Sequence, residues 1–203
     1  MQFRTWFGLL LISVSLSMPA MATISEKDPV TQVQLVSNQL VSRIESERKQ
    51  LEASNDRVNA LAEELVFPYI DITKMSRFVL GVHWRTATPE QQKTFVDLFK
   101  RLLLNSYARS FLKLQIDHID FGASRAGSGA QDKEVPATVV EKSGNHIPVI
   151  FRLLPSGDSW KTYDLEIQGI SLLLNYRGVY SSEVDQKGLP AVLAQMKAQV
   201  NDN

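Results

Sequence analysis

The stretch YDLEIQGISLLLNYRGVY, residues 163–180, changes its hydrophobic pattern at its centre. Its first part alternates polar and apolar residues, which is typical of a strand with one buried face. After Gly169 the alternation stops, and an apolar run over residues 170–174 leads into the polar residues 175–177. We expect Gly169 to let the chain turn off a sheet and the apolar run to begin a helix.

The same period of two governs the chain before this stretch. Turn residues separate the later apolar runs at Gly144 and Gly157, whereas a longer Gly- and Ser-rich loop follows the first run. The predicted strands cover residues 114–121, 134–142, 146–154 and 159–168. They predict an antiparallel sheet of four to five strands with one face toward solvent.

Helical patterns flank the predicted strands on both sides. Thr88 begins one of them as an N-cap, with Pro89 at the first helical position and Gln91 at the third. Gly81 ends a shorter helix. The predicted helices cover residues 28–65, 72–80, 88–112, 172–184 and 189–200. Helices, an antiparallel sheet and helices again, in that order, predict an α+β fold with helices packed on one face of the sheet.

The first 22 residues are predicted to be a cleaved signal peptide rather than part of the fold. Arg4 provides the basic start, and the apolar run at residues 6–18 is too short for a comfortable membrane span. Residues 20–22, Ala-Met-Ala, supply the small side chains that a signal peptidase recognises. The alternative is an uncleaved N-terminal anchor. Residues 23–203 are long enough for a single domain with its own core.

The composition of that domain indicates its cellular compartment and the classes of partner that it can bind. Without Arg4 it has 21 basic and 22 acidic residues, a net charge of −1, and it lacks the clustered surplus of Lys and Arg that phosphate contacts need. We therefore expect no nucleic-acid partner. The chain contains no cysteine, which a bacterial periplasmic domain of this size tolerates better than a secreted eukaryotic one. Together with the leader, this predicts the periplasm of a Gram-negative bacterium.

Residue types that could carry catalysis or hold a metal are present but poorly arranged. His83, His118 and His146 have neither i,i+4 partners nor cysteine neighbours, so we predict no metal site. Asp164 and Glu166 lie two apart on one strand and share a face, as acid–base chemistry would require. That face is opposite the apolar side chains of the strand, so we expect both carboxylates to be solvated. No catalytic residue is predicted.

Two arginines, Arg85 and Arg177, each follow an aromatic residue. Their predicted role is a structural ion pair, with Asp71 or Asp164 as the partner. Contact with the head group of a ligand is the alternative.

Apolar faces of helix and sheet are predicted to oppose each other. The helix over residues 88–112 has a wide apolar arc, and Ser106 and Ser110 lie in its middle, where a close-packed core would hold large side chains. Nearby Tyr and Met residues suit the mouth of a ligand cavity. A filled core is the alternative. The residues predicted to line the cavity are Tyr69, Met75, Phe78, Phe95, Phe99, Leu102, Leu103, Ser106, Tyr107, Val149, Phe151, Leu153, Tyr163, Leu165, Ile167 and Ile170.

Two longer segments are distinctive: VFPYIDITKMSRFVLGVHWRTATPEQQKTFVDLFKRLLLNSYA, residues 66–108, and WKTYDLEIQGISLLLNYRGVYSSEV, residues 160–184. In the second, a strand ends in Gly-hydrophobic-Ser-Leu and is followed by Asn-Tyr-Arg. The first segment resembles the early segment, and the second resembles the second hallmark, of the MlaC family, periplasmic phospholipid-binding proteins that include toluene-tolerance proteins. Both occur in the family's order, and the resemblance covers nearly the whole domain. Tyr180 departs from the Phe that the family often has, and the loop at residues 122–131 has no match.

The resemblance implies an NTF2-like fold with a deep apolar cavity between helices and sheet. It implies a carrier that encloses the acyl chains of a phospholipid and leaves the head group largely outside. Lipid would be shuttled between an outer-membrane lipoprotein–porin complex and an inner-membrane transporter that pairs an MCE-domain ring with an ABC ATPase. Phospholipid is then the cargo of a domain with no cofactor, no enzymatic activity and no membrane-inserted segment.

The physical chemistry of lipids agrees with such a carrier. The tails of a phospholipid hold about 30 methylenes and, at roughly 0.8 kcal/mol each, cost on the order of 25 kcal/mol in water. Two rival classes stay open. One is an enzyme on the same cavity fold with Asp164 or Asp117 as the base, which a carboxylate inside the cavity would favour. The other is a structural or chaperone-like protein for hydrophobic ligands, which an interior without a tail-sized void would favour.

Overall fold

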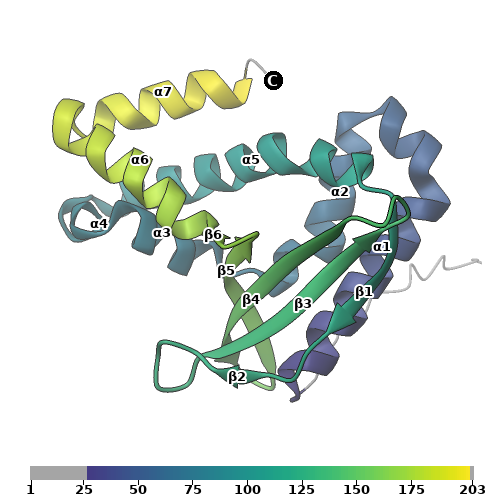
Figure 1. Cartoon of the computed structure of the whole chain (residues 1–203). Helices are drawn as coiled ribbons and strands as arrows, with labels where there is room; N and C mark the ends of the chain where they lie inside the picture. The colour runs from purple at the N-terminus through teal and green to yellow at the C-terminus, as the bar shows by residue number, and fades with distance from the viewer. Residues whose placement is uncertain (1–26, 202–203) are drawn as a thin grey trace, which may run out of the picture.

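The computed structural model describes residues 27–201, except for the side chains at positions 108, 109 and 201 (Figure 1). The predicted signal peptide therefore lies outside the described residues. In chain order the elements are α1 (Pro29–Ala53), α2 (Asn55–Leu65), the 3-10 turn η1 (Phe67–Tyr69), α3 (Ile72–Leu80), α4 (Val82–Thr86), α5 (Pro89–Lys113), β1 (Ile116–Phe121), β2 (Arg125–Ala126), β3 (Lys133–Glu141), β4 (His146–Ser156), β5 (Ser159–Ile167), β6 (Ile170–Ser171), α6 (Leu172–Lys187) and α7 (Leu189–Asn201). This is the α+β order predicted from the sequence.

The strands form one antiparallel sheet in the order β1-β3-β4-β5-β6, and the short β2 also pairs with β3. Four of its six strands match the predicted ones. The other two, β2 and β6, have two residues each and were not predicted. Such short strands show no alternation of their own, and they exist here because a neighbouring strand supplies their hydrogen-bond partners.

The inner face of the sheet is covered by α1, which crosses behind the strands in Figure 1. Val33 of α1 is buried against Val135 of β3 and Leu153 of β4. A cross-strand row on this face consists of Phe121, Ala137, Val149 and Ile167. The helices thus pack on one face of the sheet, as the sequence predicts.

The single helix predicted over residues 28–65 is broken at Ser54. Its backbone is extended there (φ −147°, ψ 119°), and its side chain accepts a hydrogen bond from the Arg57 amide as the N-cap of α2. The chain then folds back, and the ion pairs Arg43–Glu64 (2.9 Å) and Arg57–Glu47 (2.6 Å) join the two helices. We call α1 and α2 together the α1–α2 hairpin.

A helical core lies beside the sheet and is built around α5. Thr88 and Gln91 form the predicted capping box at the start of this helix. The rings of Phe95 and Phe99 are stacked at 5.8 Å and are wholly buried, with Tyr180 of α6 packed edge-on against both. Residues from α3, α6 and α7 complete this core.

The turn at Gly169 differs from the predicted exit from the sheet. Gln168 and Gly169 both have positive φ, 52° and 82°, and connect β5 to β6 as a two-residue hairpin. Turns of this kind need two left-handed residues, and their twist matches that of the flanking strands. The apolar run therefore begins as a strand, and α6 starts only at Leu172, with Ser171 as its N-cap.

The predicted solvation of Asp164 is wrong. Its side chain is buried, with 4% of the residue exposed, because β6 and the start of α6 fold back over the end of β5. Asp164 pairs with Arg152 on the outer face of the sheet, at 2.9 Å. Glu166 also binds Arg152, at 2.6 Å, and is only partly exposed.

The predicted ion pair of Arg177 with Asp71 or Asp164 is also wrong. Asp71 accepts a hydrogen bond from the Lys74 amide at 2.8 Å and caps α3. The Arg177 guanidinium lies 4.9 Å from the ring centroid of Phe78 and donates to the Phe78 carbonyl oxygen at 3.4 Å. Arg85 is exposed on α4.

Candidate ligand-binding pocket

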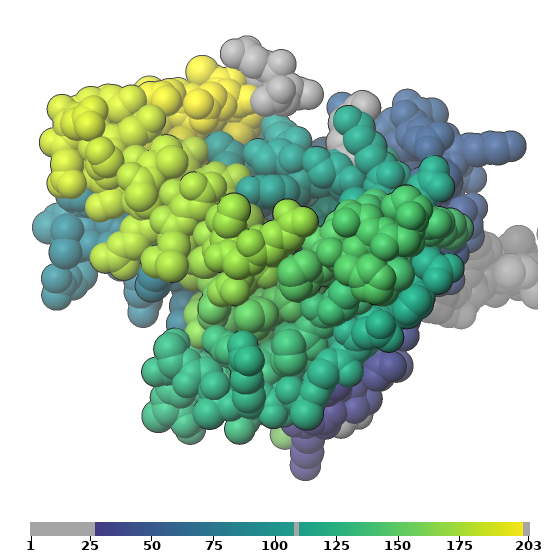
Figure 2. Space-filling model, viewed as in Figure 1, coloured from purple at the N-terminus to yellow at the C-terminus, as the bar shows by residue number. Residues whose placement is uncertain are grey.

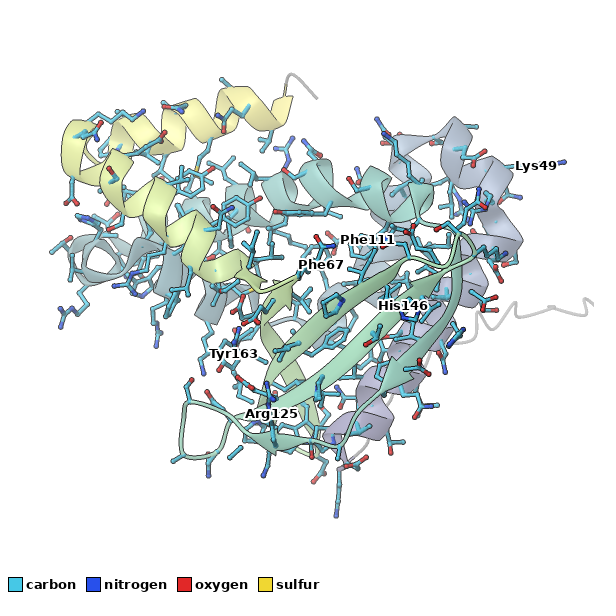
Figure 3. All side chains as sticks on the ribbon, in the orientation of Figure 1. Lys49, Phe67, Phe111, Arg125, His146 and Tyr163 are labelled. Atoms are coloured by element: carbon cyan, nitrogen blue, oxygen red, sulfur yellow. The ribbon has the colours of Figure 1, made fainter. Side chains whose placement is uncertain are left out.

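An apolar cavity of about 170 Å³ lies between the α1–α2 hairpin, α5 and the end of β5. Helix α5 forms one wall, and the η1 turn, α3 and the first residue of α6 complete the boundary. Figure 3 labels two of the lining rings, Phe67 of η1 and Phe111 of α5, below α5 where the helices meet the sheet. The lining residues are Leu40, Ile44, Val58, Leu61, Ala62, Val66, Phe67, Ile70, Met75, Leu103, Leu104, Tyr107, Phe111, Leu112, Leu165, Ile167 and Leu172.

The chemistry of this lining is nearly uniform. Its side chains are hydrocarbon, aromatic or, at Met75, thioether, and the hydroxyl of Tyr107 is the one polar side-chain group among these lining residues. None of the lining residues has a carboxylate, an imidazole or a cationic side chain. Such a surface can exclude water and hold a hydrocarbon by contact area alone, because the hydrophobic effect is non-directional.

Five of the predicted cavity residues line this pocket. Leu103 and Tyr107 come from α5, Leu165 and Ile167 from β5, and Met75 from α3. Along β5 the two apolar residues point inward with Val149 and Phe151 of β4, their register partners. Strand alternation therefore identifies the face of β5 that meets the pocket.

The predicted wall on α5 extended too far toward the start of that helix. Phe95 and Phe99 lie in the helical core, and Leu102 packs against the same core. Helix α5 is 25 residues long, so its first half faces α6 and α7 while its second half faces the pocket. A hydrophobic pattern shows that a face is buried, but not which of two neighbours buries it.

On the sheet, the predicted wall extended too far toward α1. Phe151 and Leu153 pack in the cluster under α1, and Val149 is buried outside the lining. Tyr163 leaves the predicted row because β4 and β5 change register at Arg152. Its hydroxyl donates to Asp132 at 2.7 Å, outside the pocket.

The remaining predicted residues lie at or near the surface, outside the lining. Ser106 and Ser110 are exposed, so the small residues of α5 face away from the pocket and do not widen it. Ile170 of β6 is 62% exposed and does not line the pocket. Phe78 is exposed beneath Arg177, and Tyr69 is half-buried.

The sequence-based prediction missed the wall formed by the α1–α2 hairpin. Leu40 and Ile44 of α1 and Val58 and Leu61 of α2 face the pocket. Their spacing resembles that of any amphipathic surface helix. The signal that could have located them is Ser54-Asn55-Asp56, a helix-start sequence that places a break in the middle of the predicted helix.

Charged groups gather on the outer face of the sheet, away from the pocket. Arg152 contacts three carboxylates, at 3.1 Å from Glu134, 2.9 Å from Asp164 and 2.6 Å from Glu166. Burial alone would lower the pKa of the Arg152 guanidinium, but the hydrogen bonds to these carboxylates raise it above its ordinary value. The two carboxylates considered for acid–base chemistry thus belong to an ion-pair network, which we call the Arg152 network.

Among residues 27–201, no group of three or more His, Cys, Asp or Glu side chains is placed to hold a metal ion. Nor does that range contain a helix both long enough and apolar enough to cross a membrane.

Comparison with known proteins places this architecture in a family. The chain is 18% identical over 199 residues to the intermembrane phospholipid transport system binding protein MlaC of Haemophilus influenzae, covering 97% of this chain and 93% of that protein. It is 24% identical over 167 residues to the toluene tolerance protein ttg2D of Pseudomonas putida, covering 82% and 77% of the two chains.

A solved structure shares the fold. The phospholipid-binding protein from Ralstonia solanacearum, determined in complex with a phospholipid, superposes with a TM-score of 0.77 at 25% identity. The match covers 86% of this chain and 99% of that one. The MlaC protein family model matches residues 34–198, far more than half of the sequence. The resemblance found in the sequence is thereby confirmed, and the chain belongs to the MlaC family.

Proposed function

We propose that this chain is a phospholipid carrier that holds acyl chains in the pocket between the α1–α2 hairpin, α5 and β5. The observation that carries the proposal is the lining, which is apolar on every side apart from one hydroxyl. Membership of the MlaC family and the likeness to a structure solved with a phospholipid support it.

The pocket supplies what an acyl chain needs. Each buried methylene contributes about 0.8 kcal/mol, so a chain leaves water for this lining without any directional bond. The cavity of about 170 Å³ is smaller than the roughly 300–1,000 Å³ of pockets that enclose drug-sized ligands. A two-chain lipid therefore fits inside only if the walls separate.

We place the carrier in the periplasm of a Gram-negative bacterium, after removal of residues 1–22. There it would take lipid between an outer-membrane lipoprotein–porin complex and an inner-membrane MCE-domain and ABC transporter complex. The family resemblance supports these partners. Cargo phospholipid would be the bound molecule, with no cofactor.

The enzyme and chaperone alternatives are less well supported. Asp164, one proposed base, is bound to Arg152 on the outer face of the sheet, and Asp117, the other, is on β1 beside His118 at 2.8 Å. Neither lines the pocket. A filled core would leave no cavity, whereas this fold has one.

Native mass spectrometry of the protein purified from its own periplasm tests the proposal. We expect a complex heavier than the polypeptide by the mass of a phospholipid, and organic extraction should release that lipid. Protein that is folded by circular dichroism yet free of lipid would contradict the carrier function.

A further inference from the structure

The single polar side chain in the pocket lining, Tyr107, occupies a defined place on α5. It lies one helical turn after Leu103 and one turn before Phe111, which both line the pocket. The start of α6, at Leu172, forms the adjacent boundary. The hydroxyl of Tyr107 thus lies where α5 and α6 meet beside the apolar lining.

The hydrogen bonding of Tyr107 leaves its own proton available. The hydroxyl of Tyr176 on α6 donates to the Tyr107 oxygen across 3.4 Å, a long distance for an O–H···O bond, for which about 2.7–2.8 Å is usual. Ser106 in turn forms a hydrogen bond with Tyr176. A phenol has one donor and two acceptor positions, so this contact occupies an acceptor position of Tyr107 and leaves its donor for another group.

Tyr176 is held in place by the helical core. Its ring packs edge-on against Phe99 at 5.2 Å and is stacked on Tyr180 at 6.2 Å. Burial, followed by the hydrogen bond to Tyr107, raises the pKa of Tyr176 above its ordinary value, so its proton is retained. Tyr176 therefore presents a fixed donor to Tyr107, and hydrogen bonds arranged in a chain strengthen one another.

The identity of the matching acceptor follows from the chemistry of the pocket. A phosphate would need a cationic partner, and the lining has no Lys or Arg. An ester carbonyl is neutral and is the first acceptor met at the end of an acyl chain. Burying such a carbonyl without a partner is unfavourable, because the carbonyl loses the hydrogen bonds that it makes with water. A neutral hydroxyl at the edge of an apolar pocket removes that cost.

We propose that the Tyr107 hydroxyl donates a hydrogen bond to an ester carbonyl of the bound lipid and so fixes the ester end of an acyl chain beside the α5–α6 junction. This inference rests on the proposed carrier function and adds a specificity to it. The pocket should prefer ester-linked lipids to ether-linked lipids, which have the same hydrocarbon but lack the carbonyl.

Competition between two lipids tests this directly. Vesicles contain equal amounts of ester-linked and ether-linked phosphatidylglycerol with matched saturated chains, and the protein is incubated with them, separated, and analysed for the ratio of bound lipids. We expect wild-type protein to hold the ester form in about 2- to 10-fold excess, the range for one hydrogen bond. Tyr107→Phe, which keeps the ring, should bring the ratio to one.

Tyr180→Phe is the matched control, because Tyr180 is a buried tyrosine of α6 that does not line the pocket. It should keep the preference of the wild type. Equal binding of both lipids by the wild type, or an unchanged preference in Tyr107→Phe, overturns the role of Tyr107 and leaves the carrier function standing. If neither lipid binds the wild type, the carrier function and this inference both fail.

Discussion

The carboxylate of Asp164 accepts a hydrogen bond from the backbone amide of Leu173 at 3.0 Å, which ties the end of β5 to the first turn of α6. Its other oxygen accepts from Ser171 Oγ at 2.7 Å and from Arg152 at 2.9 Å. A negative charge is favourable at the N-terminus of a helix. Leu172, between Ser171 and Leu173 in the chain, lines the pocket. The buried carboxylate thus positions part of the pocket wall from outside the pocket.

Loss of Asp164 should strongly destabilise the fold. Asp164→Ala leaves the Leu173 amide without this acceptor and removes one of the three carboxylates around the partly buried Arg152. Breaking a buried pair costs about 3–5 kcal/mol, and we expect a loss of that order in the free energy of unfolding measured with urea. Glu166→Ala is the control, because Glu166 is more exposed and should cost only about 1 kcal/mol. Equal losses would show that the cap on α6 contributes little.

A charge placed on the pocket wall should expel the cargo. Leu103→Glu puts a carboxylate among apolar lining residues, where desolvation opposes both the charge and the acyl chain. We expect the amount of phospholipid extracted per folded protein to fall at least about tenfold, which corresponds to 1.4 kcal/mol. The matched control is Leu174→Glu, the same change at a residue of α6 that is 63% exposed and outside the lining. Full lipid recovery from folded Leu103→Glu would mean that the lipid binds elsewhere.

Alkaline pH should weaken the helical core. Burial, and then the nearby charge of Glu183, raises the pKa of Tyr180 to about 12, whereas a tyrosine in an unfolded chain titrates near 10. The folded state therefore holds this proton more tightly than the unfolded state does. The contribution of protonated Tyr180 to the free energy of unfolding is complete below about pH 10 and is lost as the pH rises toward 12.

Urea midpoints measured from pH 9 to pH 11.5 check this expectation. They should fall over that interval in the wild type and fall less steeply in Tyr180→Phe. Identical slopes for the two proteins would show that Tyr180 does not contribute to the loss of stability at alkaline pH.

Local signals in the sequence predicted the elements well. Thr88 and Gln91 form their capping box, and Gly81 ends α3, because each of these preferences depends on a few neighbouring residues. The period of two also assigned Leu165 and Ile167 to the inner face of β5. The class of the fold followed from the order of these elements.

Contacts between distant segments determined the features that the sequence did not predict. Asp164 has the alternation of a solvent-facing residue, and only the return of β6 and α6 buries it. The stacked pair Phe95 and Phe99 has the same helical spacing as the lining residues farther along α5, yet it meets α6 instead of the pocket. Periodicity defines a buried face, and the partner of that face depends on the tertiary structure.

Photo-cross-linking with a phospholipid that carries a diazirine near the end of an acyl chain tests the central claim most directly. After loading and irradiation, the modified peptides are mapped by mass spectrometry. The account predicts that modification falls on the walls of the pocket, in the α1–α2 hairpin, in α5 between Leu103 and Leu112, and at the end of β5 around Leu165. Modification confined to the exposed apolar residues Phe78, Ile170 and Leu174 would contradict it, because the acyl chain would then lie on the surface and not in the pocket.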